Sequence, residues 1–278
     1  MLRTRVITAL VLFAAFLGAL FYLSPLGWLL FVTAVAGVAA WEWGALMRLG
    51  AAGQISLGVL LAFLCAIVAV LEPAAVGLGA GFDATAWRLG ACFYLPAAVF
   101  WLLLVPIWLQ RRWPLANPVL ALATGIVLLL PVWLALIQLR QAGPQALLAI
   151  MAVVWLADIG AYFAGRSLGK HKLAPSISPG KTWEGAIGGG VTVLVYGLLL
   201  SSRLPATLAG NLPLLLVLLV LLTAISILGD LFESLLKRQA GLKDSSRILP
   251  GHGGVLDRID SLTSTLPLVA LVWLATRL

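Results

Sequence analysis

The stretch LPLLLVLLVLLTAISILGDLF, residues Leu212–Phe232, decides the fold of this chain. Its first charged side chain is Asp230, near its end. A membrane-spanning helix needs about 20 consecutive apolar residues. Lipid offers the backbone no hydrogen-bond partner, so an isolated spanning segment must be a helix. The stretch therefore predicts a transmembrane helix that becomes polar at one end.

The composition extends this prediction to the whole chain. Of its 278 residues, 62% are hydrophobic and only 10% are charged, whereas an ordinary soluble domain is about a quarter charged. A soluble fold of this size could not bury so much apolar surface, so lipid must surround most of it. We predict an all-α, polytopic integral membrane protein with about nine transmembrane helices. The expected spans are Val6–Leu23, Leu26–Leu46, Ile55–Leu71, Ala91–Leu109, Val119–Ile137, Ala146–Gly165, Gly185–Ser201, Leu212–Phe232 and Val255–Thr276.

The chain divides into two membrane regions that differ in polarity. Residues 1–145 form an N-terminal region of about five spans, and residues 146–278 form a C-terminal catalytic region of about four spans. Two cytoplasmic polar loops belong to the second region. The first span is expected to be retained, because it is long for a signal peptide and no clear small-x-small cleavage site follows it.

Lysine and arginine residues predict the orientation of the chain. With the N-terminus inside, 14 of the 18 fall in inner segments and 4 in outer segments, which follows the positive-inside rule. Nine of the inner ones belong to the two polar loops, and without these the bias is 5 to 4. We expect a cytoplasmic N-terminus and an outward C-terminus. The net charge of +8 is assigned to lipid headgroups, phosphate ligands and topology rather than to nucleic acid.

Polar residues of the second half gather in two loops, 166–184 and 237–254, on the same predicted side of the membrane. The helices that lead into and out of these loops carry polar faces at spacings of three, four and eight residues. These faces are Asp158, Tyr162 and Arg166; Asp230, Glu233, Ser234 and Lys237; and Asp257, Asp260 and Ser261. The two loops are therefore expected to build one site.

Carboxylates within spanning segments are expensive, at roughly 2.5–3.5 kcal/mol each even on the lenient insertion scale. Such groups form ion pairs, line a wet cavity or bind a cation. Several aspartates beside lysine and arginine are typical of a metal–phosphate site, and hard oxygen ligands favour Mg²⁺. A structural alternative stays open for each acid, with Asp158 pairing with Arg166, Glu233 with Lys237, and Asp257 with groups beside Arg258. Glu42, a lone acid in WEWGALMRLG, is expected to have a local structural role.

The stretch ISPGKTWEGAIGGG, residues 177–190, has the Gly-Lys-Thr ending of a phosphate-binding P-loop. A P-loop needs a glycine where this chain has Pro175, and it needs a preceding strand, whereas here a span precedes. What remains is a cation and hydroxyls near a helix start, from Ser178, Lys181 and Thr182, where an anion is stabilised. The triple glycine, residues 188–190, is expected to serve helix packing.

The stretch SLLKRQAGLKDSSRILPGHGGVLDRID, residues 234–260, resembles the signature of the phosphatidate cytidylyltransferases, also called CDP-diacylglycerol synthases. That signature is Ser-x-x-Lys-Arg, Lys-Asp, His-Gly-Gly and Asp-Arg-x-Asp. The residues here are Ser234, Lys237, Arg238, Lys243, Asp244, His252, Gly253, Gly254, Asp257, Arg258 and Asp260. The upstream stretch WLADIGAYFAGRSLGKHKLAPSISPGKTWEG is also similar to the family, although many members have lysine where this chain has Gly180.

The resemblance implies a reaction, CTP + phosphatidate → CDP-diacylglycerol + pyrophosphate, that requires Mg²⁺. It implies a bacterial inner membrane with the active site facing the cytoplasm, where CTP is found. A second cation and a homodimer stay open.

The resemblance also implies roles for individual residues. Asp230 and Asp257 are the expected metal ligands, with Asp260 as a third, and these three with Lys237 form the expected catalytic group. The expected substrate-binding residues are Arg166, Ser178, Lys181, Thr182, Ser234, Arg238, Lys243, Asp244, His252, Gly253, Gly254 and Arg258.

Two alternatives compete with this reaction. A CTP-dependent polyprenol or dolichol kinase would release CDP instead of pyrophosphate. A secondary transporter would place its charges near the midplane, in two broken helices related by an internal repeat. Here the charges crowd at one predicted side of the membrane, in one half of the chain, which favours the enzyme.

Overall fold

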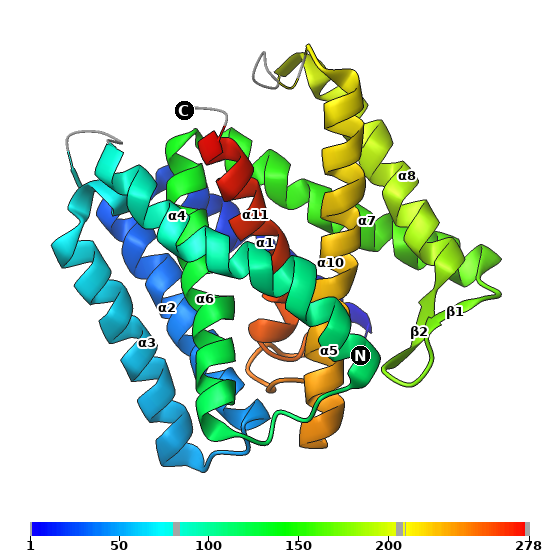
Figure 1. Ribbon diagram of the computed structural model, residues 1–278, viewed down its shortest axis with the longest axis horizontal. Helices are drawn as coiled ribbons and strands as arrows, with labels where there is room; N and C mark the ends of the chain where they lie inside the picture. The colour runs from blue at the N-terminus through cyan, green and yellow to red at the C-terminus, as the bar shows by residue number, and fades with distance from the viewer. Residues whose placement is uncertain (1, 80–83, 204–207, 209, 276–278) are drawn as a thin grey trace.

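Helices make up most of the computed structural model, which describes every residue except 1, 80–83, 204–207, 209 and 276–278 (Figure 1). The N-terminal region contains α1 (Leu2–Tyr22), α2 (Pro25–Leu46), α3 (Ala51–Leu71), η1 (Pro73–Val76), α4 (Ala84–Val99), η2 (Phe100–Leu104), α5 (Val105–Arg111) and α6 (Pro118–Gln141). The C-terminal region contains α7 (Pro144–Leu168), β1 (Lys172–Ala174), β2 (Ser178–Thr182), α8 (Trp183–Leu199), η3 (Ser201–Arg203), α10 (Leu212–Ala240) and α11 (Leu256–Ala275).

The predicted membrane architecture is confirmed. Seven of the described helices are long and apolar enough to span a membrane, and Val6–Tyr22 and Trp183–Leu199 are shorter apolar helices. Each predicted span coincides with one of these nine segments. The helix α10 continues about two turns beyond the predicted end at Phe232. Its polar face therefore lies on the same continuous helix as the apolar run that precedes it.

Two local features depart from the all-α prediction. Strands β1 and β2 form an antiparallel hairpin in the loop 166–184, with Lys172 opposite Thr182 and Ala174 opposite Ser178. The Gly-Lys-Thr sequence thus lies at the end of a strand, which corrects the expectation of an open loop. In the fourth span, η2 is a π-helical turn in which the Val105 N–H donates to the Phe100 carbonyl. Pro106 follows and has no N–H of its own, so the regular helical ladder cannot continue through it.

Helix α11 is the central element of the bundle. It packs against α10, α6, α4, α7 and α2, and most of its apolar side chains are buried. Its hydroxyl groups reach the backbone of α10, because Ser261 Oγ donates to the Ser226 carbonyl at 3.1 Å and Ser264 Oγ to the Ile225 carbonyl at 2.9 Å. These bonds satisfy polar groups that would otherwise be costly in an apolar interior.

Buried tryptophans fix α2 against α6. Trp43 donates its indole N–H to the Ala121 carbonyl at 3.0 Å, and Trp28 donates to the Leu136 carbonyl at 3.2 Å. From α6, Trp133 donates to Thr33 Oγ1 at 2.9 Å. A buried indole needs such a partner. The three bonds therefore hold the two helices in one register along much of their length.

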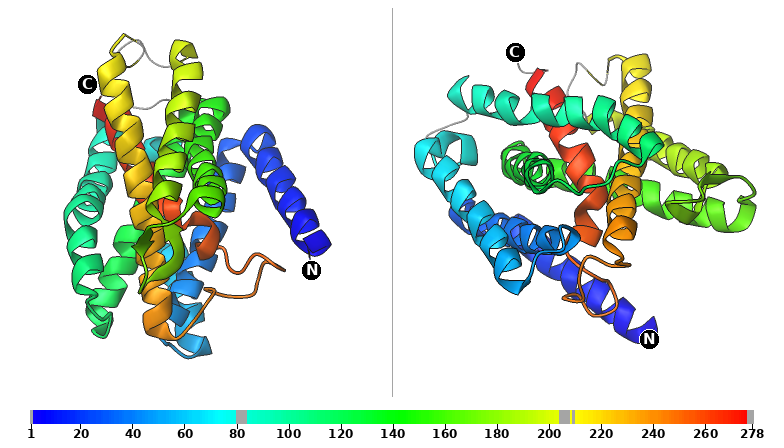
Figure 2. Two further views of the ribbon diagram at one scale, coloured as in Figure 1. Left: turned by 90° about the vertical axis from the view of Figure 1, so that its right-hand side faces the viewer. Right: turned by 60° about the horizontal axis from the view of Figure 1, so that its bottom comes forward.

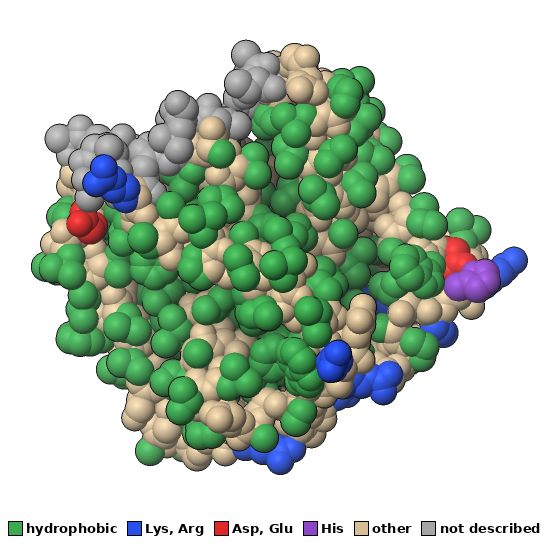
Figure 3. Space-filling model, in the orientation of Figure 1, with side chains coloured by type: hydrophobic (Ala, Val, Ile, Leu, Met, Phe, Trp, Pro, Cys, Tyr) green, Lys and Arg blue, Asp and Glu red, His purple; other side chains and the backbone are tan. Residues whose placement is uncertain are grey.

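The outer surface is mostly apolar, and exposed charged side chains lie toward its two ends. Large hydrophobic side chains are exposed on several helices, including Val59 and Phe63 of α3 and Ile187 and Val195 of α8. Figure 3 shows hydrophobic side chains over most of one face, with Lys and Arg gathered along its lower edge and lower right. In Figures 1 and 2 the loop between α10 and α11 lies at the lower end of the bundle, and the C-terminal end of α11 lies at the upper end.

Small residues let α7 and α8 approach each other closely. A Cβ added at Gly189 would lie 2.7 Å from the Ala157 carbonyl oxygen, and one at Gly185 would lie 2.9 Å from the Ala161 carbonyl oxygen. A Cβ at Gly188 would overlap Ala164. The helix-packing role predicted for the triple glycine is thus confirmed for its first two members. This close packing brings the polar ends of the two helices together.

Replacing one of these glycines tests the packing directly. Gly189→Ala should lower the free energy of unfolding by about 1–3 kcal/mol, because the added methyl group overpacks the contact with α7. Gly190→Ala is the matched control, since a Cβ there meets nothing within 4 Å and alanine favours the helix by up to about 1 kcal/mol. Thermal unfolding in detergent measures both. Equal midpoints for Gly189→Ala and the wild type would contradict the assignment.

Candidate active site

A cavity of about 470 Å³ lies where α7, α8, β2 and α10 meet. Its apolar wall is made mostly of alanine and glycine. Its polar lining is Asp158, Tyr162, Arg166, Ser178, Lys181, Thr182, Thr223 and Asp230. The cavity therefore brings the loop 166–184 together with the polar face of α10.

An ion pair joins the hairpin to α10 across this cavity. Lys181 Nζ lies 2.6 Å from Asp230 Oδ2, and Ser234 Oγ donates to Asp230 Oδ1 at 3.2 Å. On the other wall, Arg166 donates to the Tyr162 hydroxyl at 2.8 Å, not to Asp158 as the structural alternative expected. Cationic and anionic side chains of α7, α10 and the hairpin thus line the same cavity.

Local hydrogen bonds fix the hairpin that carries Lys181. Thr182 caps the N-terminus of α8, since its hydroxyl accepts from the Gly185 N–H at 3.1 Å. The Glu184 carboxylate accepts from the His171 N–H at 3.2 Å and contacts His171 Nδ1 at 2.6 Å. The Trp183 N–H donates to the His171 carbonyl. These bonds close the base of the hairpin and set where Lys181 lies.

A second group of charges links α10 to α11. The Lys237 ammonium donates to Glu233 Oε2 at 2.7 Å and to Asp257 Oδ1 at 2.6 Å. The Glu233–Lys237 pair that the structural alternative offered is therefore present. The other oxygen of Asp257 accepts from the Ser245 N–H at 2.9 Å, from Ser245 Oγ at 2.9 Å and from the Gly254 N–H at 2.8 Å. Asp257 is thus held by four donors from three segments of the chain.

Carboxylates of the two groups lie close enough to repel one another. Asp230 repels both Asp158 and Asp260, and Asp158 and Asp260 also repel each other. Lys181 attracts Asp158, as does Arg258. Carboxylates that repel one another at a membrane surface are stabilised by a cation.

These residues fit the divalent cation that the family resemblance implies. Glu233 Oε1 is buried and has no hydrogen-bond partner in the described part of the chain, and the oxygen ligands around it are of the type Mg²⁺ prefers. However, no three His, Cys, Asp or Glu side chains among the described residues are placed to hold one ion. Asp230, Asp257 and Asp260 are therefore not gathered as the predicted set of three. Mg²⁺ usually takes only one or two carboxylates, with substrate phosphates and water completing its shell.

The remaining predicted residues lie on or beside the loop between α10 and α11. Four of them are exposed at this end of the bundle: Arg238, Lys243, Asp244 and Arg258. His252 is half-buried and its backbone N–H donates to the Leu249 carbonyl at 2.9 Å. Gly253 adopts a φ of +80° in a tight turn. The Gly254 N–H donates to Asp257 at 2.8 Å, so in this arrangement it supports that carboxylate.

Sequence reasoning missed how far Glu42 reaches. The expected structural role is local, but its carboxylate lies within hydrogen-bond distance of four donor groups from residues 203 to 214 positions away: Ser245, Ser246, Val255 and Leu256. The signal in the sequence was a single acid within an apolar span, a costly placement that needs several donors nearby.

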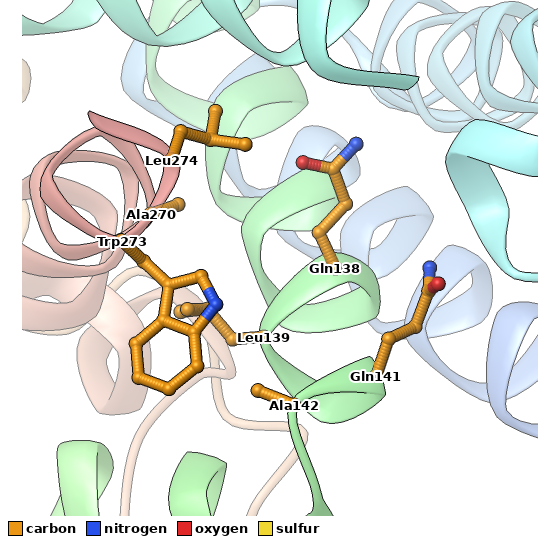
Figure 4. A pocket seen from close by; sticks show the side chains of 7 residues that line it. All are labelled: Gln138, Leu139, Gln141, Ala142, Ala270, Trp273 and Leu274. Atoms are coloured by element: carbon orange, nitrogen blue, oxygen red, sulfur yellow. The ribbon is translucent and has the colours of Figure 1, made fainter. Parts of the chain in front are cut away.

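A smaller cavity of about 210 Å³ lies at the opposite end of α6 and α11 (Figure 4). Its lining is Gln138, Leu139, Gln141, Ala142, Ala270, Trp273 and Leu274. None of these side chains carries a charge. This cavity therefore lacks the groups that phosphate or metal chemistry needs, and the larger cavity is the candidate active site.

Comparison with known proteins identifies a family and full-length relatives. The sequence model described as "Cytidylyltransferase family" matches residues 3–275. A phosphatidate cytidylyltransferase of Pseudomonas aeruginosa is 42% identical over 290 residues, covering 99% of this chain and 98% of that protein. One from Haemophilus influenzae is 39% identical, with 96% of each chain covered. One from Brucella suis is 38% identical, covering 97% of this chain and 92% of its own.

Removing the Lys237 ammonium group, which links α10 to α11, should lower the stability of the fold. Lys237→Met leaves Glu233 and Asp257 as buried carboxylates without a paired cation, although Asp257 keeps its hydrogen bonds from Ser245 and Gly254. We expect a loss of about 3–5 kcal/mol in unfolding free energy. Arg238→Met is the control, because Arg238 is exposed and should change the stability by less than about 0.5 kcal/mol. Thermal unfolding in detergent measures both variants. A Lys237→Met midpoint equal to that of Arg238→Met would contradict the burial of this pair.

Proposed function

The chain belongs to the cytidylyltransferase family, and from that premise we propose how its polar end transfers the cytidylyl group of CTP to phosphatidate. The products of this reaction are CDP-diacylglycerol and pyrophosphate. The enzyme is an integral membrane nucleotidyltransferase of phospholipid biosynthesis. None of the relatives described above is named as a kinase or a transporter, so those two alternatives receive no support from them.

One observation carries the assignment of the site. The 470 Å³ cavity is lined by Arg166, Lys181 and Asp230, and the ion pair of Lys237 with Asp257 lies about two turns further along α10. Phosphatidate presents its phosphate at the depth of the lipid headgroups, which is the depth of these helix ends. CTP is a polyanion from the aqueous side. A cavity that offers cations and hydroxyls at this depth suits both substrates.

In this reaction the protein needs only to position the two substrates and to neutralise the charge of their phosphates. An oxygen of the phosphatidate phosphate attacks the α-phosphorus of CTP, a new P–O bond forms, and the bond from that phosphorus to the bridging oxygen of pyrophosphate breaks. Phosphatidate is already ionised near neutral pH, so no general base is required. The cations of the site hold the two polyanions in line and stabilise the charge that shifts to the leaving pyrophosphate.

Mg²⁺ would be held by Asp230 and Asp257, with Asp260 as a further candidate. When bound, it would neutralise negative charge on the triphosphate. Lys237 holds Asp257 in place from the side of α10, and Lys181 contacts Asp230. Both carboxylates are thus oriented by ammonium groups of this chain. A second cation stays open as part of the proposal.

The substrates would be bound by residues from both polar loops. Arg166, Ser178, Lys181 and Thr182 line the cavity, and Ser234 orients Asp230. From the second loop we assign Arg238, Lys243, Asp244, His252 and Arg258 to substrate contacts. Exposed lysines and arginines here would also meet the negative surface of the lipid bilayer.

The site is proposed to face the cytoplasm of a bacterial inner membrane. The bias of lysine and arginine toward this end supports the orientation, and so does the need for cytosolic CTP. The Lys and Arg side chains along the lower edge in Figure 3 belong to this end.

A product assay tests the function. Purified chain in mixed micelles, given CTP, phosphatidate and Mg²⁺, should release CDP-diacylglycerol and pyrophosphate in equal amounts. A kinase would release CDP instead. If no CDP-lipid forms in the presence of Mg²⁺, the proposal fails.

A pair of arginine variants tests the location of the site. A charge-assisted hydrogen bond contributes about 1.5–3 kcal/mol, so Arg166→Ala should lower kcat/KM for at least one substrate about 10- to 100-fold. Arg203→Ala is the matched control, because Arg203 is an exposed arginine at the other end of α8 and should leave both constants unchanged. Initial rates with each substrate varied give the two constants. Wild-type values for Arg166→Ala would place the substrates elsewhere.

A further inference from the structure

Glu42 is a fully buried carboxylate in the N-terminal half of the chain. Its exposure is 0%, and burying an ionised group is costly unless several hydrogen bonds compensate. Glu42 Oε1 accepts from Ser246 Oγ at 2.6 Å and from the Val255 N–H at 2.9 Å. Oε2 accepts from the Leu256 N–H at 2.6 Å and lies 3.2 Å from Ser245 Oγ. All four donors come from the loop between α10 and α11 or from the start of α11.

Two of these bonds cap the central helix from a distant element. The first N–H groups of a helix have no partner within it, and a negative charge at this end is favourable. Val255 and Leu256 lie at the start of α11, and both donate to Glu42 of α2. The direction in which α11 leaves the loop is therefore set by a residue of the N-terminal half.

Ser245 connects Glu42 to Asp257. Its hydroxyl lies 3.2 Å from Glu42 Oε2 and 2.9 Å from Asp257 Oδ2, so both carboxylates compete for one proton. The Ser245 backbone N–H also donates to Asp257. There is no space for a side chain at Gly254, because a Cβ there would overlap Ser245 Oγ and Glu42 Oε1. The four residues form one interlocked unit, and a displacement of Glu42 moves the groups that hold Asp257.

The frame that carries Glu42 is rigid. Trp43, the next residue, is buried and donates to the Ala121 carbonyl of α6. Gly125 of α6 lies directly against the Trp43 indole, with no room for a Cβ. Helix α2 therefore cannot rotate to bring Glu42 elsewhere without breaking the core.

We propose that Glu42 is a positioning residue for cytidylyl transfer, which fixes the orientation of Asp257 through Ser245 and the first turn of α11. This inference rests on the proposed function of the site. It gives the N-terminal region a part in catalysis, although that region contributes no residue to the cavity itself. Glu42 does not contact substrate in this account and acts only through Asp257.

The variant Glu42→Gln tests the proposal. Glutamine keeps the shape but presents an NH₂ group to donors, so at least one of the four hydrogen bonds becomes a clash of donors. We expect kcat to fall at least tenfold, while KM for CTP and for phosphatidate changes less than threefold. Glu72→Gln is the matched control, since Glu72 follows α3 at the opposite end of the bundle and should retain wild-type kcat and KM.

Ser245→Ala and the double variant distinguish positioning from general destabilisation. Ser245→Ala removes the hydroxyl between the two carboxylates and should also lower kcat, with little change in KM. Because both residues act through Asp257, the double variant should lose much less than the product of the two single losses. Rates are expressed per folded molecule, with the folded fraction measured by thermal unfolding at the assay temperature. A role in folding alone would lower that fraction and leave kcat per folded molecule unchanged.

Each outcome decides the proposal. A fall in kcat with stable KM values and a non-additive double variant supports it. Wild-type kcat in Glu42→Gln overturns it, as does a loss confined to KM or a strictly multiplicative double variant. If Glu42→Gln does not fold, wild-type kcat in Ser245→Ala overturns it. An inactive wild-type enzyme would instead refute the proposed function, so the two failures are distinct.

Discussion

The buried carboxylate of Asp257 is the interaction on which the polar end of this protein depends. It accepts hydrogen bonds from Lys237 of α10 and from Ser245 and Gly254 of the following loop, while it lies in the first turn of α11. A charge so deeply placed would be too costly without these donors. Three segments must therefore come together for Asp257 to be buried, and their meeting builds the second half of the site.

The same constraint explains why the charges lie together. Lipid surrounds the apolar faces of the helices, so ionised side chains are stable only where they are paired or hydrogen-bonded, at the helix ends or in a wet cavity. Close packing of α7 and α8 through glycine and alanine brings Arg166 and Lys181 to one end of the bundle. Asp230 lies near the same end, on the continuous helix α10, whose preceding residues are mostly apolar. The position of the site thus follows from the few places where ionised side chains are stable in a membrane protein.

Much of this arrangement could be predicted from the sequence, because it depends on local periodicity. Apolar runs of spanning length predicted the helices, and the spacing of four residues made a pair of Glu233 with Lys237 one of the open alternatives. The contact of Lys181 with Asp230 was expected in outline, since both polar loops were assigned to one side of the membrane. The hairpin was not predicted, because Pro175, Pro179 and Gly180 interrupt any alternating pattern. The long-range contacts of Glu42 depend on how α2 packs against α6, which no local pattern in the sequence encodes.

The central claim is that the loops 166–184 and 237–254 form one nucleotide site around Asp230 and Asp257. An experimental structure of the chain with CTP and Mg²⁺ in a lipid environment tests it most directly. The account predicts nucleotide phosphates within hydrogen-bond distance of Lys181, with the ion on Asp230 or Asp257. Nucleotide in the cavity beside Gln138, or an ion held by other residues, would contradict it.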